Sequence, residues 1–303
     1  MLRRFLVAAG VCTLAAGAYA GCGGSPITPQ PPPPIVQPPV NAAPNIESIT
    51  VQGRRRRQPA AVADIRETVD VSATVRDSET PVEQLVYQWT ASVGTFTGTG
   101  RAVTWTAPDS VDKSIREPLT VTITLKVIEH YGHPGQAPAW SHEVTATTSV
   151  RLHDSVREIG DMSRLFLDKF SQPQTIRDWR EVMSDFDLDG GTCPDPRQVD
   201  AEKDDVIRHY THFVMHRYEI GAANVSVDFG EGCHVPLRGW RPGDACVRVP
   251  VFWDSTDTRD NTRGISTGTD WISAAYSVPK SRWFLCSSDF PPSNTLGHSF
   301  YAR

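Results

Sequence analysis

Apolar and polar side chains alternate with a period of two in several segments between residues 45 and 152. These segments are rich in Val and Thr, and Gly, Pro, Asp and Ser separate them. Such a pattern is typical of short strands that bury one face and expose the other. We therefore predict an all-β domain over residues 45–152, with strands at 46–52, 69–76, 85–91, 102–106, 119–128 and 144–152.

The pattern changes to a helical period after residue 153. Ser155 and Glu158 have the spacing of a capping box, and apolar residues follow three or four positions apart as far as Phe170. Further helices are expected at 175–183 and 200–218, and strands at 224–229, 246–253, 268–278 and 282–290. Helices followed by a run of strands predict an α+β layer for residues 153–303.

Two motifs in the predicted β domain resemble bacterial immunoglobulin-like and PKD-like domains. One is the Tyr-x-Trp strand at 87–89, and the other is the Trp-x-Ala-Pro segment at 105–108. The resemblance implies an immunoglobulin-like β-sandwich for residues 45–152. Such modules usually space or present another domain.

The C-terminal segment resembles the nuclear transport factor 2-like (SnoaL-like) fold. The residues that carry the resemblance are the first helix, the turn at 187–191, the helix end at 218–220, and the segments 247–253, 268–271 and 282–290. The resemblance implies a cone, in which three helices cover a curved antiparallel sheet. Enzymes and inert binding modules both use this fold, so it does not decide the function.

The first 44 residues indicate where the protein works. Arg3 and Arg4 precede a short apolar run that ends in small residues, which predicts a signal peptide over residues 1–21. The next residue, Cys22, resembles the lipidated cysteine of bacterial lipoproteins. The apolar run is too short to span a membrane as a helix. We expect a protein of the bacterial cell envelope, anchored by lipid to the outer membrane.

The composition of the rest of the chain refines this picture. Residues 22–44 form the anchor and a linker. This stretch contains nine of the chain's 24 prolines, which favour an extended polyproline II stalk. The net charge of −5 predicts no nucleic-acid partner. We interpret the arginine run at 54–57 as a solvated turn between two strands.

The number of cysteines in the rest of the chain agrees with export to an oxidising compartment. Loss of the signal peptide and lipidation of Cys22 leave four cysteines, which predict two disulfides with three possible connectivities. We favour the pairs Cys233–Cys246, which flank a loop rich in Gly and Pro, and Cys193–Cys286. A zinc site is the competing interpretation, but the sequence has no C-x-x-C pair.

Two polar clusters are candidate metal sites. Asp185, Asp187 and Asp189 match the opening of a calcium-binding EF-hand loop, but Pro196 stands where the loop needs Glu, so an acidic turn is the alternative. The stripe His209, His212 and His216 on the predicted third helix faces away from its apolar side. We interpret that stripe as solvated, with a surface metal site as the alternative. No other cofactor is expected.

An acid/base pair is the remaining chemical candidate. Asp270 shares the phase of Ile272, Ala274 and Tyr276, which predicts that its side chain points into the cone. Asp270 with Tyr210 or Tyr276 would then form the pair that an enzyme of the SnoaL-like type needs. The alternative is an aspartate that simply begins a strand.

We therefore expect a non-catalytic protein that presents a disulfide-stapled binding domain at the membrane. The ligand would be a small apolar molecule in the cone, or a protein partner on the sheet. One alternative is a SnoaL-like lyase or isomerase with Asp270 as its base. Another is a calcium-dependent surface adhesin.

Overall fold

The computed structural model describes residues 40–112, 118–132, 140–172, 175–176, 178–221, 225–230, 241 and 243–288. All of them belong to one compact unit, residues 39–303. We call residues 40–153 the two-sheet region and residues 154–288 the C-terminal region. Among the described residues, no helix is both long and apolar enough to cross a membrane.

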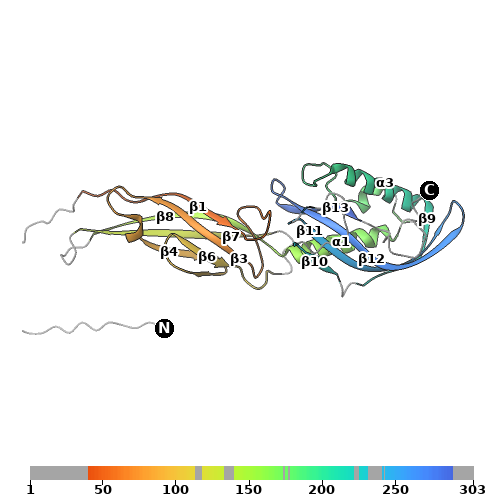
Figure 1. Ribbon diagram of the computed structural model, residues 1–303, viewed down its shortest axis with the longest axis horizontal. Coiled ribbons are helices and arrows are strands. Elements are labelled where there is room, and N and C mark those ends of the chain that lie inside the picture. The colour runs from red at the N-terminus through yellow and green to blue at the C-terminus, as the bar shows by residue number, and fades with distance from the viewer. Residues whose placement is uncertain are drawn as a thin grey trace, which may run out of the picture. The chain divides into compact units, whose positions relative to one another are not determined.

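The two-sheet region consists of two four-stranded sheets (Figure 1). Its elements are β1 (Asn45–Gln52), β2 (Val62–Asp64), β3 (Thr68–Arg76), η1 (Val82–Gln84), β4 (Val86–Ala91), β5 (Thr95–Thr97), β6 (Ala102–Thr106), β7 (Leu119–Tyr131) and β8 (Trp140–His153). The strand orders are β1-β3-β6-β5 and β2-β8-β7-β4, and only the β2–β8 pairing is parallel. The sequence did not predict β2 and β5, because three residues are too few to show a period.

Two clusters of buried hydrophobic residues join the two sheets. Val71 and Trp105 from the first sheet and Ile123 and Val150 from the second are buried in the same cluster. The alternation seen in the sequence therefore places one face of each sheet against the other. The β-rich character predicted for this region is confirmed.

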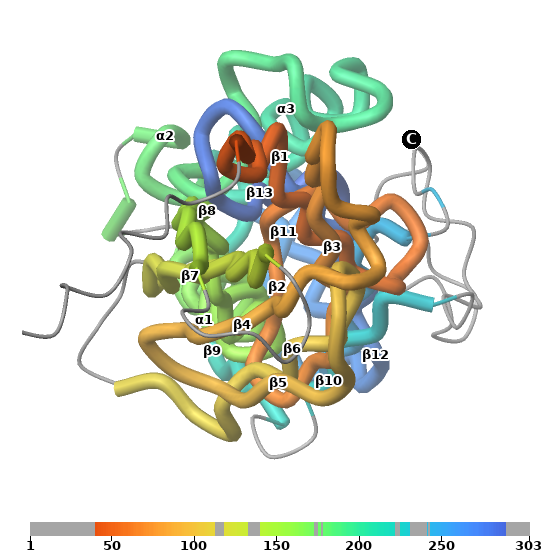
Figure 2. Tube along the Cα trace, turned by 90° about the vertical axis from the view of Figure 1, so that its left-hand side faces the viewer, coloured from red at the N-terminus to blue at the C-terminus, as the bar shows by residue number. Residues whose placement is uncertain are grey.

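The C-terminal region places helices on one face of an antiparallel sheet. Its elements are α1 (Ser155–Phe170), α2 (Trp179–Val182), α3 (Pro196–His212), β9 (Phe213–Ile220), β10 (Ser226–Asp228), β11 (Ala245–Asp257), β12 (Thr262–Ser277) and β13 (Arg282–Ser288). The sheet order is β10-β11-β12-β13, and β9 also pairs with β11. The long helices α1 and α3 both contact β13, and α2 lies against both of them (Figure 2).

The first helix begins one residue earlier than its predicted capping box. Asp154 is its N-cap and accepts a hydrogen bond from the backbone N–H of Arg157. The Glu158 side chain in turn accepts from the N–H of Asp154 at 3.2 Å. Ile159, Phe166 and Phe170 point from this helix into the core shared with the sheet.

The predicted third helix was wrong at its C-terminal end. The helix ends at His212, and residues 213–220 form β9, which pairs with β11 from Val251 to Asp257. The backbone of Phe213 is already extended, with φ −114° and ψ 139°. Pairing with β11 decides the structure here, because the apolar spacing of this segment fits a helix as well as a strand.

Candidate functional site

The arginine run at 54–57 forms the loop between β1 and β2, and the interpretation as a solvated turn was wrong for part of it. Arg54 does face solvent, where it pairs with Asp70 at 2.5 Å. Arg55 is only partly exposed and forms ion pairs with Asp64 and, at 3.3 Å, with Glu67. These carboxylates hold Arg55 against the C-terminal region, where its guanidinium carbon lies 4.6 Å from the centre of the Phe229 ring.

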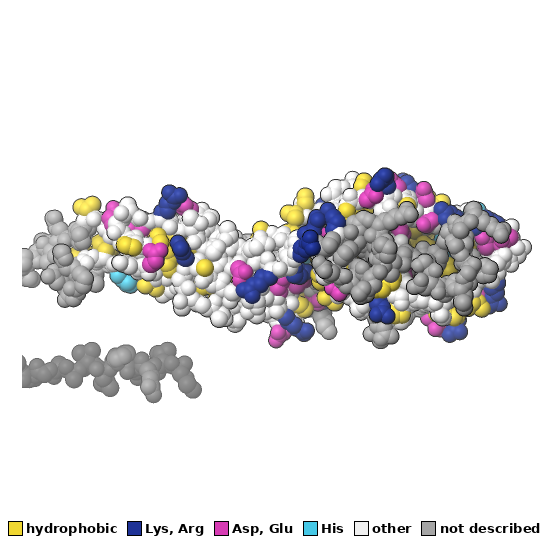
Figure 3. All heavy atoms as spheres, viewed as in Figure 1, with side chains coloured by type: hydrophobic (Ala, Val, Ile, Leu, Met, Phe, Trp, Pro, Cys, Tyr) yellow, Lys and Arg dark blue, Asp and Glu magenta, His cyan; other side chains and the backbone are white. Residues whose placement is uncertain are grey.

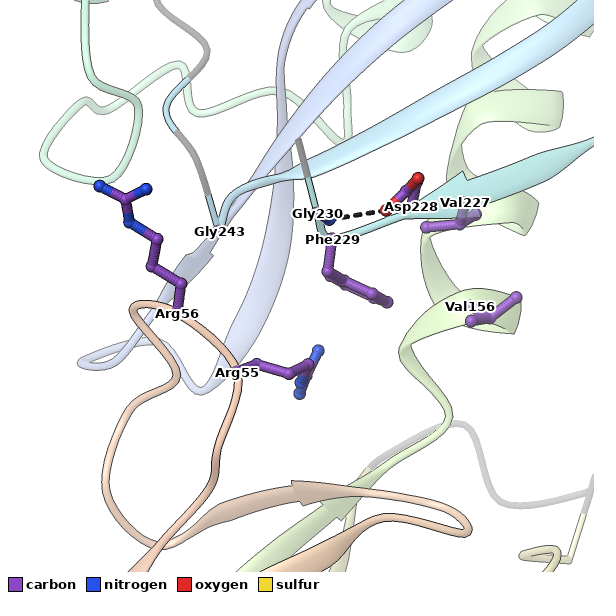
Figure 4. Close-up of a pocket in the computed structure, with 8 residues that line it drawn as sticks. All are labelled: Arg55, Arg56, Val156, Val227, Asp228, Phe229, Gly230 and Gly243. Carbon is purple, nitrogen blue, oxygen red and sulfur yellow. Dashed lines mark hydrogen bonds between the residues drawn. The ribbon is translucent and has the colours of Figure 1, made fainter. Parts of the chain in front are cut away.

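An open pocket of about 520 Å³ lies between this loop and the C-terminal region (Figure 4). We call it the junction pocket. It is lined by Arg55, Arg56, Val156, Val227, Asp228, Phe229, Gly230 and Gly243. Val156 at the start of α1 and Val227 on β10 form an apolar wall beside Phe229. The rim is polar, and there Asp228 accepts a hydrogen bond from the N–H of Gly230 at 2.6 Å.

Gly243 allows the loop and the C-terminal region to approach each other closely. Its φ is +100°, in the region that favours glycine. A Cβ at this position would lie 2.4 Å from the carbonyl oxygen of Arg56. A larger residue would therefore push the arginine loop away and open one wall of the junction pocket.

A smaller pocket of about 180 Å³ adjoins the junction pocket and shares Arg55, Arg56 and Gly243 with it. Tyr276 and Trp283 supply part of its other wall. Basic side chains gather on the surface where the two regions meet (Figure 3). The junction is therefore hollowed, and arginines of its loop pair with carboxylates of Asp70, Asp64 and Asp244.

A hydrogen-bond network fixes the two regions beneath these pockets. Asp64 on β2 accepts from the N–H of Ser155 at 2.8 Å, in addition to its ion pair with Arg55. The buried His153 lies between the Glu158 carboxylate at 3.0 Å and the Tyr276 hydroxyl at 3.1 Å. Burial raises the pKa of Tyr276, so its hydroxyl keeps its proton. Tyr276, predicted as a catalytic partner, is thus a junction residue.

Asp270 is fully buried on β12, on the face that packs against the helices. Its carboxylate accepts a hydrogen bond from the Ser288 hydroxyl at 3.1 Å. Tyr210 packs against the core of helices and sheet, while Tyr276 contacts His153. The charge of Asp270 acts on Tyr218. The pKa of Tyr218 is raised mainly by burial and, to a smaller extent, by the charge of Asp270.

Sequence reasoning missed Tyr218 because it placed this residue on a helix. Recognition of β9 as a strand would have put Tyr218 opposite Trp253 on β11. Asp270 itself does not line the junction pocket.

The acidic turn at 185–189 is neutralised by basic side chains. Asp185 pairs with Arg282 at 3.1 Å, and Asp189 pairs with Lys280 at 3.1 Å. The buried Asp187 accepts from the backbone N–H groups of Thr192 and Cys193. Within the described ranges, no three His, Cys, Asp or Glu side chains are grouped as a metal site would need. Arg282 therefore pairs with Asp185, whereas Lys280 lies near both Asp189 and, at 3.8 Å, Asp187.

The histidine stripe does not exist as predicted. His209 is only 1% exposed and stacks on Phe170 at 4.0 Å and on Phe213 at 5.2 Å. His216 lies on β9, where its Nε2 is 2.7 Å from the Thr256 hydroxyl. The helix ends between these residues, which separates their side chains. Burial lowers the pKa of His209 to about 3.

The predicted disulfide Cys193–Cys286 is confirmed, with 5.5 Å between the Cα atoms. Cys246 is also disulfide-bonded. Its predicted partner, Cys233, lies outside the described residues, and so does the predicted lipidation site Cys22.

Comparison with known proteins adds no assignment: no family model, no curated protein and no solved structure matches the chain. The geometry of the junction therefore carries the functional argument.

Proposed function

We propose that this chain is a non-catalytic binding protein of the bacterial envelope, anchored to the outer membrane through Cys22. In this proposal the two-sheet region presents the C-terminal region and supplies one wall of its binding site. The site is the junction pocket, and its ligand is a small, largely apolar molecule. The observation that carries the proposal is an open, partly apolar pocket that residues from both regions build together.

The chemistry of the junction pocket supports an apolar ligand. Val156 is 55% exposed although it stands beside Val227 and the Phe229 ring. A ligand that covers these groups removes apolar surface from water, which is favourable. The charge of Arg55 is already balanced by Asp64 and Glu67, so its guanidinium serves to orient a polar group of the ligand. Small-molecule sites usually measure about 300–1,000 Å³, and the junction pocket falls within this range.

The two regions fit the architecture expected from the sequence resemblances. Two facing sheets are compatible with an immunoglobulin-like spacer, and helices on an antiparallel sheet are compatible with a nuclear transport factor 2-like cone. Phe166, Phe186 and Trp253 are buried between helices and sheet. Because these large side chains occupy the space inside the C-terminal region, we place the ligand at the junction.

The position of Asp270 supports binding without catalysis. Its side chain is fully buried, and it is not among the residues of the junction pocket. A general base must come within hydrogen-bond reach of the proton that it removes. A ligand in the junction pocket is not in contact with Asp270, so we assign this aspartate to the core.

The proposal predicts that filling the junction pocket weakens ligand binding. The dye 8-anilinonaphthalene-1-sulfonate has a large apolar body, and its fluorescence rises on transfer from water to an apolar site. We expect saturable binding to the full chain, weakened at least tenfold by Val156→Trp, because the indole would occupy the apolar wall. The exposed Val156 tolerates a larger residue without disturbing the core.

The matched control is Leu165→Trp. Leu165 is also an exposed apolar residue of α1, but it does not line the junction pocket. This variant should bind the dye as the wild type does. Equal dye affinity in the wild type and in Val156→Trp would refute the junction pocket as the binding site.

A further inference from the structure

Three buried oxygen atoms have no hydrogen-bond partner among the described residues of the two-sheet region. They are Oδ1 of Asn41, Oδ2 of Asp77 and Oε2 of Glu129. Asn41 lies just before β1, Asp77 follows β3 and Glu129 lies near the end of β7. Each unsatisfied buried acceptor costs free energy, so three of them at one place require an explanation.

Hydrogen bonds place these three groups next to one another. Oε1 of Glu129 accepts from the Asn41 side-chain amide at 2.9 Å and from the Thr80 hydroxyl. Oδ1 of Asp77 accepts from the backbone N–H of Thr80 at 2.6 Å and from that of Glu79 at 2.9 Å. Thr80 therefore bridges the two carboxylates, and Asn41 contacts one of them directly.

No basic side chain neutralises this cluster within the part of the chain that the structure describes. Glu129 is fully buried, yet neither it nor Asp77 has an ion pair there. His142 lies opposite Glu129 on β8, but its Nε2 contacts the Asn41 backbone oxygen at 3.3 Å and its ring stacks on Tyr131. A buried carboxylate without a compensating charge is strongly unfavourable.

We propose that Asn41, Asp77 and Glu129 bind a calcium ion. Two carboxylates and an amide oxygen are the hard oxygen donors that calcium prefers, whereas zinc and copper favour nitrogen and sulfur. Two negative charges also match the charge of a divalent cation. Backbone carbonyls and water would complete the coordination. Extracellular modules typically bind calcium at about 10⁻⁴–10⁻³ M.

This inference goes beyond the proposed ligand site and does not depend on it. The ion would join Asn41, the turn at 77–80 and β7. Asn41 lies in the segment that we predict to be the end of the proline-rich stalk. Calcium would therefore fix the point where the stalk joins the two-sheet region.

The test is calcium binding by the full, oxidised chain. Thermal unfolding in millimolar calcium, compared with EGTA, should show a midpoint raised by roughly 5 °C, because a ligand of the folded state stabilises it. Terbium should give luminescence on excitation of aromatic side chains, since Tyr131 and Trp140 stack beside His142. Calcium should displace this luminescence.

Two conservative variants identify the site. Asp77→Asn and Glu129→Gln should each abolish the calcium-dependent shift and the terbium signal, yet remain at least as stable as the wild type in EGTA. The control is Asp189→Asn, an aspartate of the other acidic turn, which should keep the full shift.

Two outcomes would overturn the calcium site. The first is a wild type that does not respond to calcium. The second is a calcium response that survives both Asp77→Asn and Glu129→Gln.

Discussion

His209 couples the stability of the C-terminal region to pH through a single buried imidazole. Burial holds its pKa at about 3 in the folded chain, against about 6.5 when unfolded. Below about pH 6.5 the unfolded chain therefore takes up a proton that the folded chain refuses. The contribution of the neutral His209 to the free energy of unfolding is therefore fully present above about pH 6.5. It is lost progressively as the pH falls toward 3.

We predict that His209→Phe removes this pH dependence. The phenyl ring can keep the stacking on Phe170 and Phe213. Between pH 6 and pH 4, the unfolding free energy of the wild type should fall faster than that of the variant by about 1.4 kcal/mol per pH unit. Urea titrations at several pH values measure the difference, and parallel pH profiles would contradict a neutral, buried His209.

The strand β13 is held at the edge of its sheet by a covalent link. Cys286 bonds to Cys193, and the Leu285 backbone exchanges hydrogen bonds with Asp185 and Asp187. The disulfide closes a loop of 93 residues. Constraining an unfolded loop of this length is worth roughly 4.6 kcal/mol in the chain-entropy picture.

We therefore predict that the double variant Cys193→Ser, Cys286→Ser is less stable by roughly 4.6 kcal/mol. Urea unfolding of the oxidised protein measures this loss. Mass spectrometry should show that the disulfide of Cys246 is intact in the variant, so that only one bridge is compared. A loss below about 1 kcal/mol would mean that the hydrogen bonds of β13 suffice.

The elements that could be predicted from sequence are those in which the alternation of buried and exposed residues fits only one secondary structure. The strand β3 alternates buried and exposed positions along its whole length, as a period of two requires. The segment 213–220 instead has apolar residues at spacings that suit either structure, and only its partner β11 makes it a strand. Tertiary pairing overrides such ambiguous local patterns.

The junction pocket could not be predicted, because no local pattern contains it. Its walls come from residues 55, 156 and 227–229, which only the fold brings together. The arginine run looks solvated in sequence, and only the fold places Asp64 and Glu67 where they pair with Arg55. The same limit applies to Asp270, whose inward direction was expected but whose neighbour Tyr218 was not.

Among the described residues, the hydrophobic core of the C-terminal region is separate from the two core clusters of the two-sheet region. Their coupling rests on the junction, and Asp64 is its central acceptor. One carboxylate oxygen of Asp64 accepts a hydrogen bond from the backbone N–H of the buried Ser155. The other oxygen accepts a hydrogen bond from the Arg55 guanidinium. The cores of the two regions do not share residues. We therefore expect the contacts of Asp64 to couple the unfolding of the two regions.

We predict that Asp64→Ala uncouples the two regions. The wild type should give one calorimetric transition, whereas the variant should give two, since a buried N–H without an acceptor costs about 1–3 kcal/mol at the junction. Asp70→Ala is the matched control, because it removes the exposed ion pair of the same arginine loop and should leave the single transition unchanged. A single, unshifted transition in Asp64→Ala would show that other contacts couple the two cores. The dye affinity should fall in parallel with the uncoupling, because Arg55 and Val156 belong to opposite walls of the junction pocket.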